Sequence, residues 1–364
     1  MLYFVIVTTR CNLRCMYCGN DPSLLSEPPD LAYSVKDLRR FLEEDEDPII
    51  CFYGGEPLLA LDVIEEVMDS IEARRWILQT NGLLLKRLRR RYLTMFDTIL
   101  VSIDGRPEVT DYYRGRGVYE KVIENVKDIR SRGFRGDIIA RMAVSGATDI
   151  YRDVVHLLEL ENPKFDHVHW QLDVLWDYPP YQRYTDFDSW VDNVYNPGIS
   201  RLVNYWIDNM MDKGEVKGIV PFLGLMKHML LRQKPRLHCG AGLDAFAIAP
   251  SGRIMACPVA YDVEELHLGH IKTTRPRELP GRVNISGPCP TCDLYWACGG
   301  RCLYANKTML WGLEGFCKVC KTVRHLVSEL LRVKPIVEML IRRHIVELDQ
   351  LIYPKYNNST EIIP

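Results

Sequence analysis

The sequence predicts an α/β fold in which repeated strand–helix units form a parallel sheet or partial barrel, followed by a cysteine-rich region. Three observations support this prediction. Short apolar, β-branched segments recur along the first half of the chain, amphipathic stretches separate them, and eight of the twelve cysteines are concentrated between Cys239 and Cys320. Strands that alternate with helices are typical of parallel sheets, whereas closely spaced cysteines indicate metal or redox chemistry in a reducing compartment.

Six segments have the length and composition of buried strands. They are residues 2–8, 48–53, 75–79, 98–103, 137–144 and 167–175. Between them, stretches such as 61–73 and 119–132 place apolar residues at intervals of three and four, as a helix packed on a sheet does. Six such units indicate a partial (β/α)6 TIM-type barrel, whose working edge is the carboxyl end of its strands.

Changes in composition divide the chain into four parts. We expect the barrel over 1–190, a helical connector over 191–238, a cysteine-rich domain over 239–321, and C-terminal helices with a tail over 322–364. An aromatic-rich passage from Trp170 to Trp206 either lines a channel for an extended peptide or packs as the core of a lid. The last helix is expected to be interrupted at Pro335, and the last dozen residues to be frayed.

Charge and the N-terminal sequence exclude several functions. The 46 Lys and Arg residues nearly balance the 48 Asp and Glu residues, giving a net charge of −2, so bulk charge attracts neither nucleic acid nor an anionic membrane. The basic run at 86–91 is typical of a solvated helix face. The apolar N-terminus is too short to span a membrane and lacks the marks of a signal peptide. We therefore expect a cytoplasmic protein with no membrane or nucleic-acid partner.

Three cysteines follow directly on the first predicted strand and therefore lie at the carboxyl edge of the sheet. These are Cys11, Cys15 and Cys18. A structural zinc ion takes four protein ligands, but the first histidine is His156, so a fourth ligand is missing locally. Three thiolates can instead hold three irons of a 4Fe–4S cluster and leave the fourth iron open to a small molecule. A zinc site or a disulfide is the alternative.

This spacing, with Tyr17 before the third cysteine, resembles the CxxxCxxC signature of the radical S-adenosylmethionine (SAM) enzymes. The resemblance implies that SAM chelates the open iron and that an electron from the reduced cluster splits SAM. The resulting 5′-deoxyadenosyl radical then abstracts a substrate hydrogen. The resemblance also implies anaerobic chemistry and an external low-potential electron donor of the flavodoxin or ferredoxin type.

Residues at the ends of the next strands resemble the same family. The second strand runs into Gly54, Gly55 and Glu56, a motif that in the family binds the amino group of SAM. Glycines at a strand end permit close backbone approach, and Glu56 offers an acceptor for an ammonium group. Polar residues that the resemblance places near the methionine carboxylate or the ribose are Asn81, Ser102 and Asp104.

A cationic partner for the SAM carboxylate is expected nearby. Arg114 is the candidate because a guanidinium group matches the geometry of a carboxylate. Arg116 and Arg141 are competitors for this role.

The later cysteines resemble the seven-cysteine SPASM extension of radical SAM enzymes that modify peptides and proteins. The resemblance implies two auxiliary 4Fe–4S clusters. The inner cluster would be held by Cys239, Cys257 and Cys302, and the outer cluster by Cys289, Cys292, Cys298 and Cys317. Some relatives supply a fourth inner cysteine where this chain has Ala245. Either Cys320 fills that gap, or one iron stays open to water or substrate. A zinc ribbon is the alternative to both clusters.

The function implied by both resemblances is hydrogen abstraction from a peptide or protein, as in the maturation of ribosomal peptides, leading to a crosslink, an oxidation or an epimerisation. Pro258 stands where sulfatase-maturating relatives have an aspartate, which disfavours formylglycine formation. One alternative is a radical SAM oxidoreductase acting on a small molecule or cofactor precursor. Another, from a different class, is a non-catalytic iron–sulfur or zinc scaffold.

Overall fold

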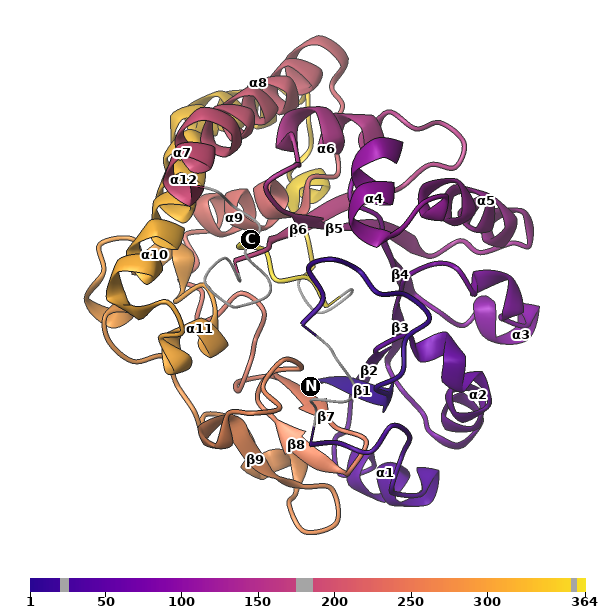
Figure 1. Cartoon of the computed structure of the whole chain (residues 1–364). Coiled ribbons are helices and arrows are strands. Elements are labelled where there is room, and N and C mark those ends of the chain that lie inside the picture. Colours follow the sequence, from indigo (N-terminus) through magenta and orange to yellow (C-terminus); the bar gives the residue numbers. More distant parts are fainter. Residues whose placement is uncertain (20–25, 175–185, 355–358) are drawn as a thin grey trace.

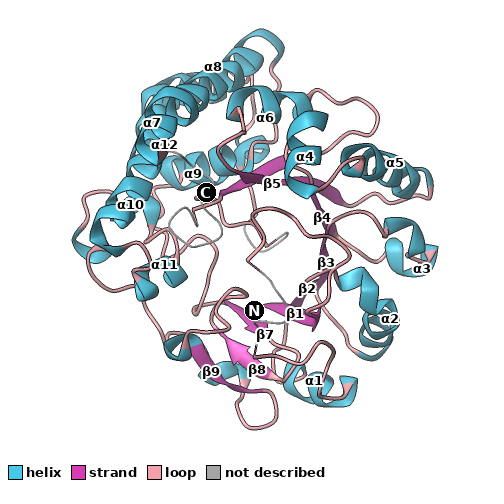
Figure 2. Cartoon of the chain, in the orientation of Figure 1, coloured by secondary structure: helices cyan, strands magenta, loops and turns pink. Residues whose placement is uncertain are grey.

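The strands form an incomplete ring with helices on its outside, as a computed structural model shows for residues 1–19, 26–174, 186–354 and 359–364 (Figures 1 and 2). Six strands follow one another around the ring and are parallel to their neighbours. They are β1 (Leu2–Thr8), β2 (Ile49–Gly54), β3 (Arg75–Thr80), β4 (Thr98–Ser102), β5 (Asp137–Val144) and β6 (His167–Leu172). The predicted partial (β/α)6 barrel is therefore confirmed.

The helices between these strands cover the outer face of the sheet. They are α1 (Val35–Leu42), α2 (Leu61–Ser70), α3 (Arg90–Leu93), α4 (Pro107–Arg114), α5 (Val118–Ser131) and α6 (Ile150–Leu158). The start of α1 shows why the chain turns into a helix there: Ser34 and Asp37 form a capping box that satisfies two terminal N–H groups. The site residues can therefore lie in the loops at the carboxyl ends of the strands.

Three strands from the cysteine-rich half extend the same sheet beyond β1. They are β7 (Ala245–Ile248), β8 (Arg253–Met255) and β9 (His267–His270). β7 pairs with β1 in parallel, and β8 and β9 follow as antiparallel neighbours. Sequence periodicity does not predict this pairing, because each strand is short and its partner lies far away in the chain.

Helices from the second half of the chain complete the ring on its other side (Figure 1). They are α7 (Phe187–Trp190), the π-helical η3 (Val191–Tyr195), α8 (Asn196–Lys213), α9 (Val220–Leu230), α10 (Tyr295–Cys298), α11 (Leu303–Thr308) and α12 (Gly312–Arg342). Short 3₁₀ turns are η1 (Pro57–Ala60), η2 (Leu85–Arg87), η4 (Glu264–Leu266), η5 (Pro276–Glu278), η6 (Cys289–Thr291) and η7 (Leu348–Leu351). The packing of the helices α7 to α12 closes the ring between the cysteine-rich region and β6.

The expected break at Pro335 is wrong. α12 continues through this proline, although a proline removes one hydrogen bond of the helix. Val333, Val337 and Leu340 are buried around it, and α12 packs along α8 and α9. Burial of this apolar face outweighs the lost hydrogen bond.

The last segment, 359–364, is not frayed as expected but buried. Ile362 and Ile363 are 1% and 2% exposed, and the C-terminal end marked in Figure 1 lies inside the ring. Ile362 packs against Gly224, where an added Cβ would meet its side chain at 2.5 Å. The Nε atom of Arg301 donates to the carbonyl oxygen of Pro364 at 2.8 Å. A short apolar segment gives little periodic signal, which explains the error.

The aromatic passage packs as core where the structure describes it. Trp170 and Trp206 are fully buried, and the indole N–H of Trp170 donates to the hydroxyl of Tyr195 at 3.0 Å. The stretch Trp176–Tyr181, which belongs to the same prediction, lies outside the described residues.

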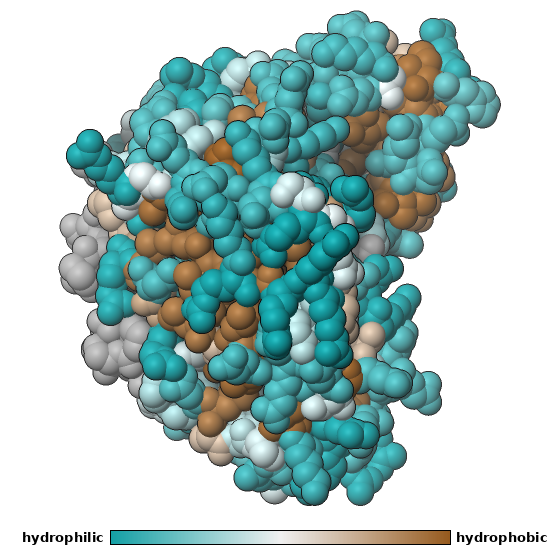
Figure 3. Space-filling model, turned by 90° about the vertical axis from the view of Figure 1, so that its right-hand side faces the viewer, coloured by the Kyte–Doolittle hydropathy of each residue, from teal (hydrophilic) through white to brown (hydrophobic). Residues whose placement is uncertain are grey.

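The surface over the outer helices is largely hydrophilic, with hydrophobic patches between (Figure 3). The basic run at 86–91 is neutralised in part, because Lys86, Arg89 and Arg91 are each ion-paired with a carboxylate. Within the described part of the chain, no helix is both long and apolar enough to cross a membrane.

Candidate active site

The three N-terminal cysteines lie in one loop at the carboxyl end of β1. Cys11 and Cys15 are partly buried, and Cys18 is exposed. The backbone N–H of Met16 donates to the carbonyl of Tyr113 in α4 at 2.9 Å, and the N–H of Cys18 donates to the carbonyl of Cys15 at 3.0 Å. The loop is thereby held at the carboxyl end of the sheet.

The thiols of this loop influence one another electrostatically. Burial raises the pKa of Cys15 to about 11, and the charges of Cys18 and Cys11 raise it further. The Sγ atom of Cys11 accepts a hydrogen bond from the side-chain amide of Asn81 at 3.9 Å. Neighbouring thiols that accept N–H donors suit a shared iron–sulfur cluster, whose binding deprotonates them.

The two glycines after β2 let this strand dock against the start of the cysteine loop. A Cβ on Gly54 would lie 2.2 Å from the carbonyl oxygen of Thr8, and a Cβ on Gly55 would lie 2.3 Å from that of Arg10. The N–H of Gly55 donates to Thr8 at 3.0 Å, and the N–H of Glu56 donates to Arg10 at 2.8 Å. The close approach is therefore to the backbone of the protein itself.

Glu56 is fully buried, and its carboxylate is surrounded by protein donors. One oxygen accepts the hydroxyl of Thr80 at 2.7 Å and the N–H of Leu58 at 3.0 Å, while the other accepts the N–H of Asn81 at 2.7 Å. Burial raises the pKa of Glu56 to about 7, against the lowering effect of these hydrogen bonds. These contacts fix the turn after β3, and the expected contact of Glu56 with the ammonium group of SAM stays a prediction.

Asp104 and Arg114 form a buried ion pair that positions Tyr17. The Nε and Nη2 atoms of Arg114 donate to the two oxygens of Asp104, each at 2.8 Å, and the hydroxyl of Tyr17 donates to Asp104 at 2.7 Å. The guanidinium carbon lies 5.4 Å from the centre of the Tyr17 ring. The guanidinium group of Arg114 is thus bound to Asp104 within the protein, and its expected role toward the SAM carboxylate stays a prediction.

The competitor Arg141 points into the ring instead. It is the register partner of Ser102 on β4 and of His169 on β6. Its Nη2 atom lies 2.9 Å from a carboxylate oxygen of Glu361. Glu361 is missing from the sequence predictions, because no motif marks it.

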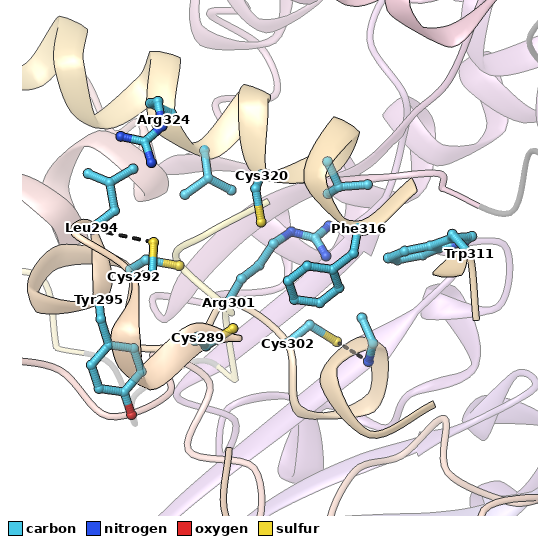
Figure 4. A pocket seen from close by; sticks show the side chains of 15 residues that line it. Cys289, Cys292, Leu294, Tyr295, Arg301, Cys302, Trp311, Phe316, Cys320 and Arg324 are labelled. Atoms are coloured by element: carbon cyan, nitrogen blue, oxygen red, sulfur yellow. Dashed lines mark hydrogen bonds between the residues drawn. The ribbon is translucent and has the colours of Figure 1, made fainter. Parts of the chain in front are cut away.

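Five of the later cysteines line one pocket with a cavity volume of about 50 Å³ (Figure 4). They are Cys289, Cys292, Cys298, Cys302 and Cys320. The sulfur of Cys320 points into the pocket from α12 (Figure 4). Burial raises its pKa to about 12, and Cys298 and Cys289 add to this rise. Cys317, the expected fourth outer ligand, is exposed and does not line the pocket.

The expected inner set also converges. Burial raises the pKa of Cys257 well above its ordinary value, and the charges of Cys302 and Cys239 raise it further. Cys302 lies at the start of α11, where its sulfur accepts the N–H of Ala305 at 3.4 Å. Ala245 opens β7 and provides no ligand.

The donor chemistry suits clusters better than the alternatives. All twelve cysteines lie within the described residues, and none forms a disulfide. Among the described Cys, His, Asp and Glu side chains, no three are grouped as a single metal ion requires. Groups of three and four thiols are what a multi-iron cluster needs.

Comparison with protein families shows that residues 5–160 match the model of the Radical SAM superfamily. The chain is 23% identical over 290 residues to a "Probable GTP 3',8-cyclase" of Archaeoglobus fulgidus, which covers 75% of this chain and 94% of that protein. It is 28% identical to an "Fe-coproporphyrin III synthase" of Methanosarcina barkeri over 35% of this chain and 34% of that protein. The alignments with several other curated relatives also span only about a third to a half of the relative's length.

Solved structures share the fold over most of the chain. A structure described as native anSMEcpe with bound AdoMet has a TM-score of 0.71 at 18% identity and covers 93% of this chain and 100% of that one. SuiB of Streptococcus suis, bound to the precursor peptide SuiA, has a TM-score of 0.57 at 16% identity, with 84% and 72% covered. The similarity includes the cysteine-rich half as well as the barrel.

Proposed function

Because residues 5–160 place the chain in the Radical SAM superfamily, we propose that this enzyme modifies a residue of a peptide or protein. SAM and a reduced 4Fe–4S cluster supply, when bound, a radical that removes a hydrogen atom from the substrate. An external low-potential donor of the flavodoxin or ferredoxin type provides the electron.

The residues described above have distinct roles in this proposal. Cys11, Cys15 and Cys18 hold the cluster and leave one iron for SAM. Asp104 and Arg114 orient Tyr17 and so fix the cysteine loop, and the packed ring excludes water from the reacting atoms. Asn81 and Ser102 lie at neighbouring strand ends, where they can bind polar groups of SAM.

One observation supports a peptide as the substrate. The inside of the ring already accommodates a polypeptide segment, residues 359–364, buried among side chains from several strands and helices. The solved structures with peptides, SuiB with SuiA and anSMEcpe with the Kp18Cys peptide, share the fold of this chain. An interior that can enclose backbone as well as side chains suits a peptide substrate.

Two auxiliary 4Fe–4S clusters of SPASM type complete the proposal. We assign Cys289, Cys292, Cys298 and Cys320, which line the pocket together with Cys302, to the outer cluster, because Cys298 and Cys289 act electrostatically on Cys320, whereas Cys302 acts on Cys257. Cys239, Cys257 and Cys302 would hold the inner cluster. With Cys320 in the outer set, one inner iron has no cysteine and stays available to water or substrate.

A small-molecule substrate is the second candidate. The alignment with the probable GTP 3',8-cyclase supports it, because that similarity extends over three quarters of this chain. Coexpression with candidate peptides separates the two, since a mass change in a peptide requires the peptide reaction.

The test of the radical reaction is anaerobic. We expect the purified protein, reduced with dithionite, to release 5′-deoxyadenosine from SAM. A variant with Cys11, Cys15 and Cys18 changed to Ala should lose this activity and about four irons per chain. Cys51→Ser is the matched control, because Cys51 is buried in β2 away from the loop. Unchanged cleavage in the triple variant would refute the proposal, and bound zinc in place of iron would favour a scaffold.

A further inference from the structure

Two basic side chains inside the ring face a carboxylate that comes from the end of the chain. Arg141 on β5 and His169 on β6 are register partners. The Nη2 atom of Arg141 lies 2.9 Å from one oxygen of Glu361, and the Nε2 atom of His169 lies 3.4 Å from the other. His169 is fully buried. Burial and the neighbouring charge of Arg141 hold its pKa well below the ordinary value.

Glu361 does not satisfy all the hydrogen-bonding groups of Arg141 and His169. The Nε atom of Arg141, the Nδ1 atom of His169 and one oxygen of Glu361 are buried without a hydrogen-bond partner among the described residues. By contrast, Arg114 gives both Nε and Nη2 to a carboxylate at 2.8 Å. A guanidinium binds a carboxylate best through two parallel hydrogen bonds. A carboxylate that is not attached to this segment could therefore make contacts that Glu361 does not.

This group lies within electrostatic reach of both cysteine regions. Burial raises the pKa of Tyr53 to about 12, and the charges that also act on it include those of Arg141, Glu361, Cys257 and Cys18. Glu361 likewise acts on Cys257.

Segment 359–364 makes further polar contacts in this space. Cys51 donates to the hydroxyl of Ser359 at 3.7 Å, and Arg301 donates to Pro364. Ser359 and Ile362 have φ angles of +58° and +66°. The left-handed region is unfavourable for a β-branched residue such as Ile362. The bound conformation is therefore strained, and another ligand can compete with it.

We propose that Arg141 and His169 form a carboxylate-binding subsite inside the barrel, which Glu361 occupies in place of the carboxylate of a bound molecule. Segment 359–364 then competes with that molecule for the interior. The carboxylate belongs either to the methionine part of SAM or to an acidic residue of the substrate. Both sources rest on the proposed function, since SAM is its cofactor and a peptide its substrate.

The test measures binding to the full-length, cluster-containing protein under anaerobic conditions. The variant is Glu361→Gln, and the matched control is Glu338→Gln, which removes an ion pair with Lys334 on α12. The probes are SAM, decarboxylated SAM, the hexapeptide Ser-Thr-Glu-Ile-Ile-Pro of residues 359–364, and the same hexapeptide with Gln for Glu.

Removing the internal competitor should tighten binding of a carboxylate ligand by about tenfold. A gain for SAM but not for decarboxylated SAM assigns the subsite to the cofactor. A gain for the Glu hexapeptide but not for its Gln form assigns it to a substrate carboxylate. In both cases the gain should vanish when Arg141→Met is added to Glu361→Gln, a pair that leaves no uncompensated charge at this position.

Two results would overturn the inference. One is equal binding of every probe to Glu361→Gln and to the control variant, and the other is a gain that survives Arg141→Met. If SAM does not bind at all, the proposed function fails, while the hexapeptide still tests the subsite. Circular dichroism of each variant shows that it is folded.

Discussion

The carboxyl group of Glu56 has a pH-dependent effect on stability that can be measured. Its pKa is raised from the ordinary value of 4.5 to about 7, so the folded state binds this proton more tightly than the unfolded state does. The stabilising contribution is complete below pH 4.5 and is lost as the pH rises through about 7. We expect up to ~3 kcal/mol of the stability change between these limits to come from this group.

Glu56→Gln should flatten that pH dependence. It should also destabilise the fold by ~1–3 kcal/mol at every pH, because the new amide would face an N–H donor that the carboxylate now accepts. Urea unfolding at pH 5 and pH 8 gives both effects. Glu43→Gln, at an exposed ion pair with Arg39, is the control. If the free energy of unfolding depends on pH in the same way in Glu56→Gln as in the unsubstituted protein, Glu56 is not the source of this dependence.

Removing one partner of the Asp104–Arg114 pair should lower the free energy of unfolding more than the Glu56 substitution does. Asp104→Asn leaves the buried Arg114 without its counter-charge, and we expect a loss of ~3–5 kcal/mol. Asp30→Asn, which breaks the exposed pair with Arg10, should cost less than about 1 kcal/mol. Thermal unfolding compares the two, and similar losses would show that Asp104 and Arg114 are not an essential pair.

Individual residues were predictable from the sequence to different degrees. The cysteine loop and the glycines after β2 stand out because their spacing is distinctive. The hydrogen-bond partners of Glu56, Asp104 and Arg114 could not be predicted. These contacts join three different strand ends, and only the folded sheet brings them together.

At the scale of elements, the end of β2 determines how closely the cysteine loop can approach. Gly55→Ala would place a methyl group 2.3 Å from the carbonyl oxygen of Arg10, and backbone on both sides cannot move away easily. We expect loss of the iron bound by the loop and destabilisation of at least ~1–3 kcal/mol. Gly287→Ala, where no atom lies within 4 Å of the added Cβ, is the control. Full iron content in Gly55→Ala would refute this account of the motif.

α12 presents two cysteines, and the structure distinguishes them. Cys320→Ser should remove about four irons per chain, because Cys320 lies in the pocket, whereas Cys317→Ser should leave the iron content unchanged. Iron analysis and the optical spectrum of each variant provide the measurement. The reverse result would restore the ligand set expected from the sequence. The sequence places both cysteines in the cysteine-rich domain and reveals neither their helix nor which of them faces the other thiols.

At the scale of the whole molecule, the cysteine-rich half is part of the barrel sheet. β7 and β1 share a register from Leu2 to Val5, so they should unfold together. Hydrogen exchange followed by mass spectrometry should show residues 245–248 protected to the same extent as β1 and β2. Exchange of 245–248 well before β1 would mean that the two halves open independently.

The global architecture was only partly predictable. The six parallel strands follow from local composition, since each is a continuous apolar run. The pairing of β7 with β1 and the burial of 359–364 depend on contacts between distant segments, and neither leaves a periodic pattern in the sequence.

The shared β1–β7 register also sets the geometry between the two cysteine regions. Because neighbouring strands in a sheet are ~4.8 Å apart, the spacing from the first cysteine loop to the hairpin that bears Cys257 is determined by ladder hydrogen bonds. The intervening helices α8 and α9 do not set it. Insertions at the half-buried turn after Lys213 should therefore leave the spacing between these regions unchanged.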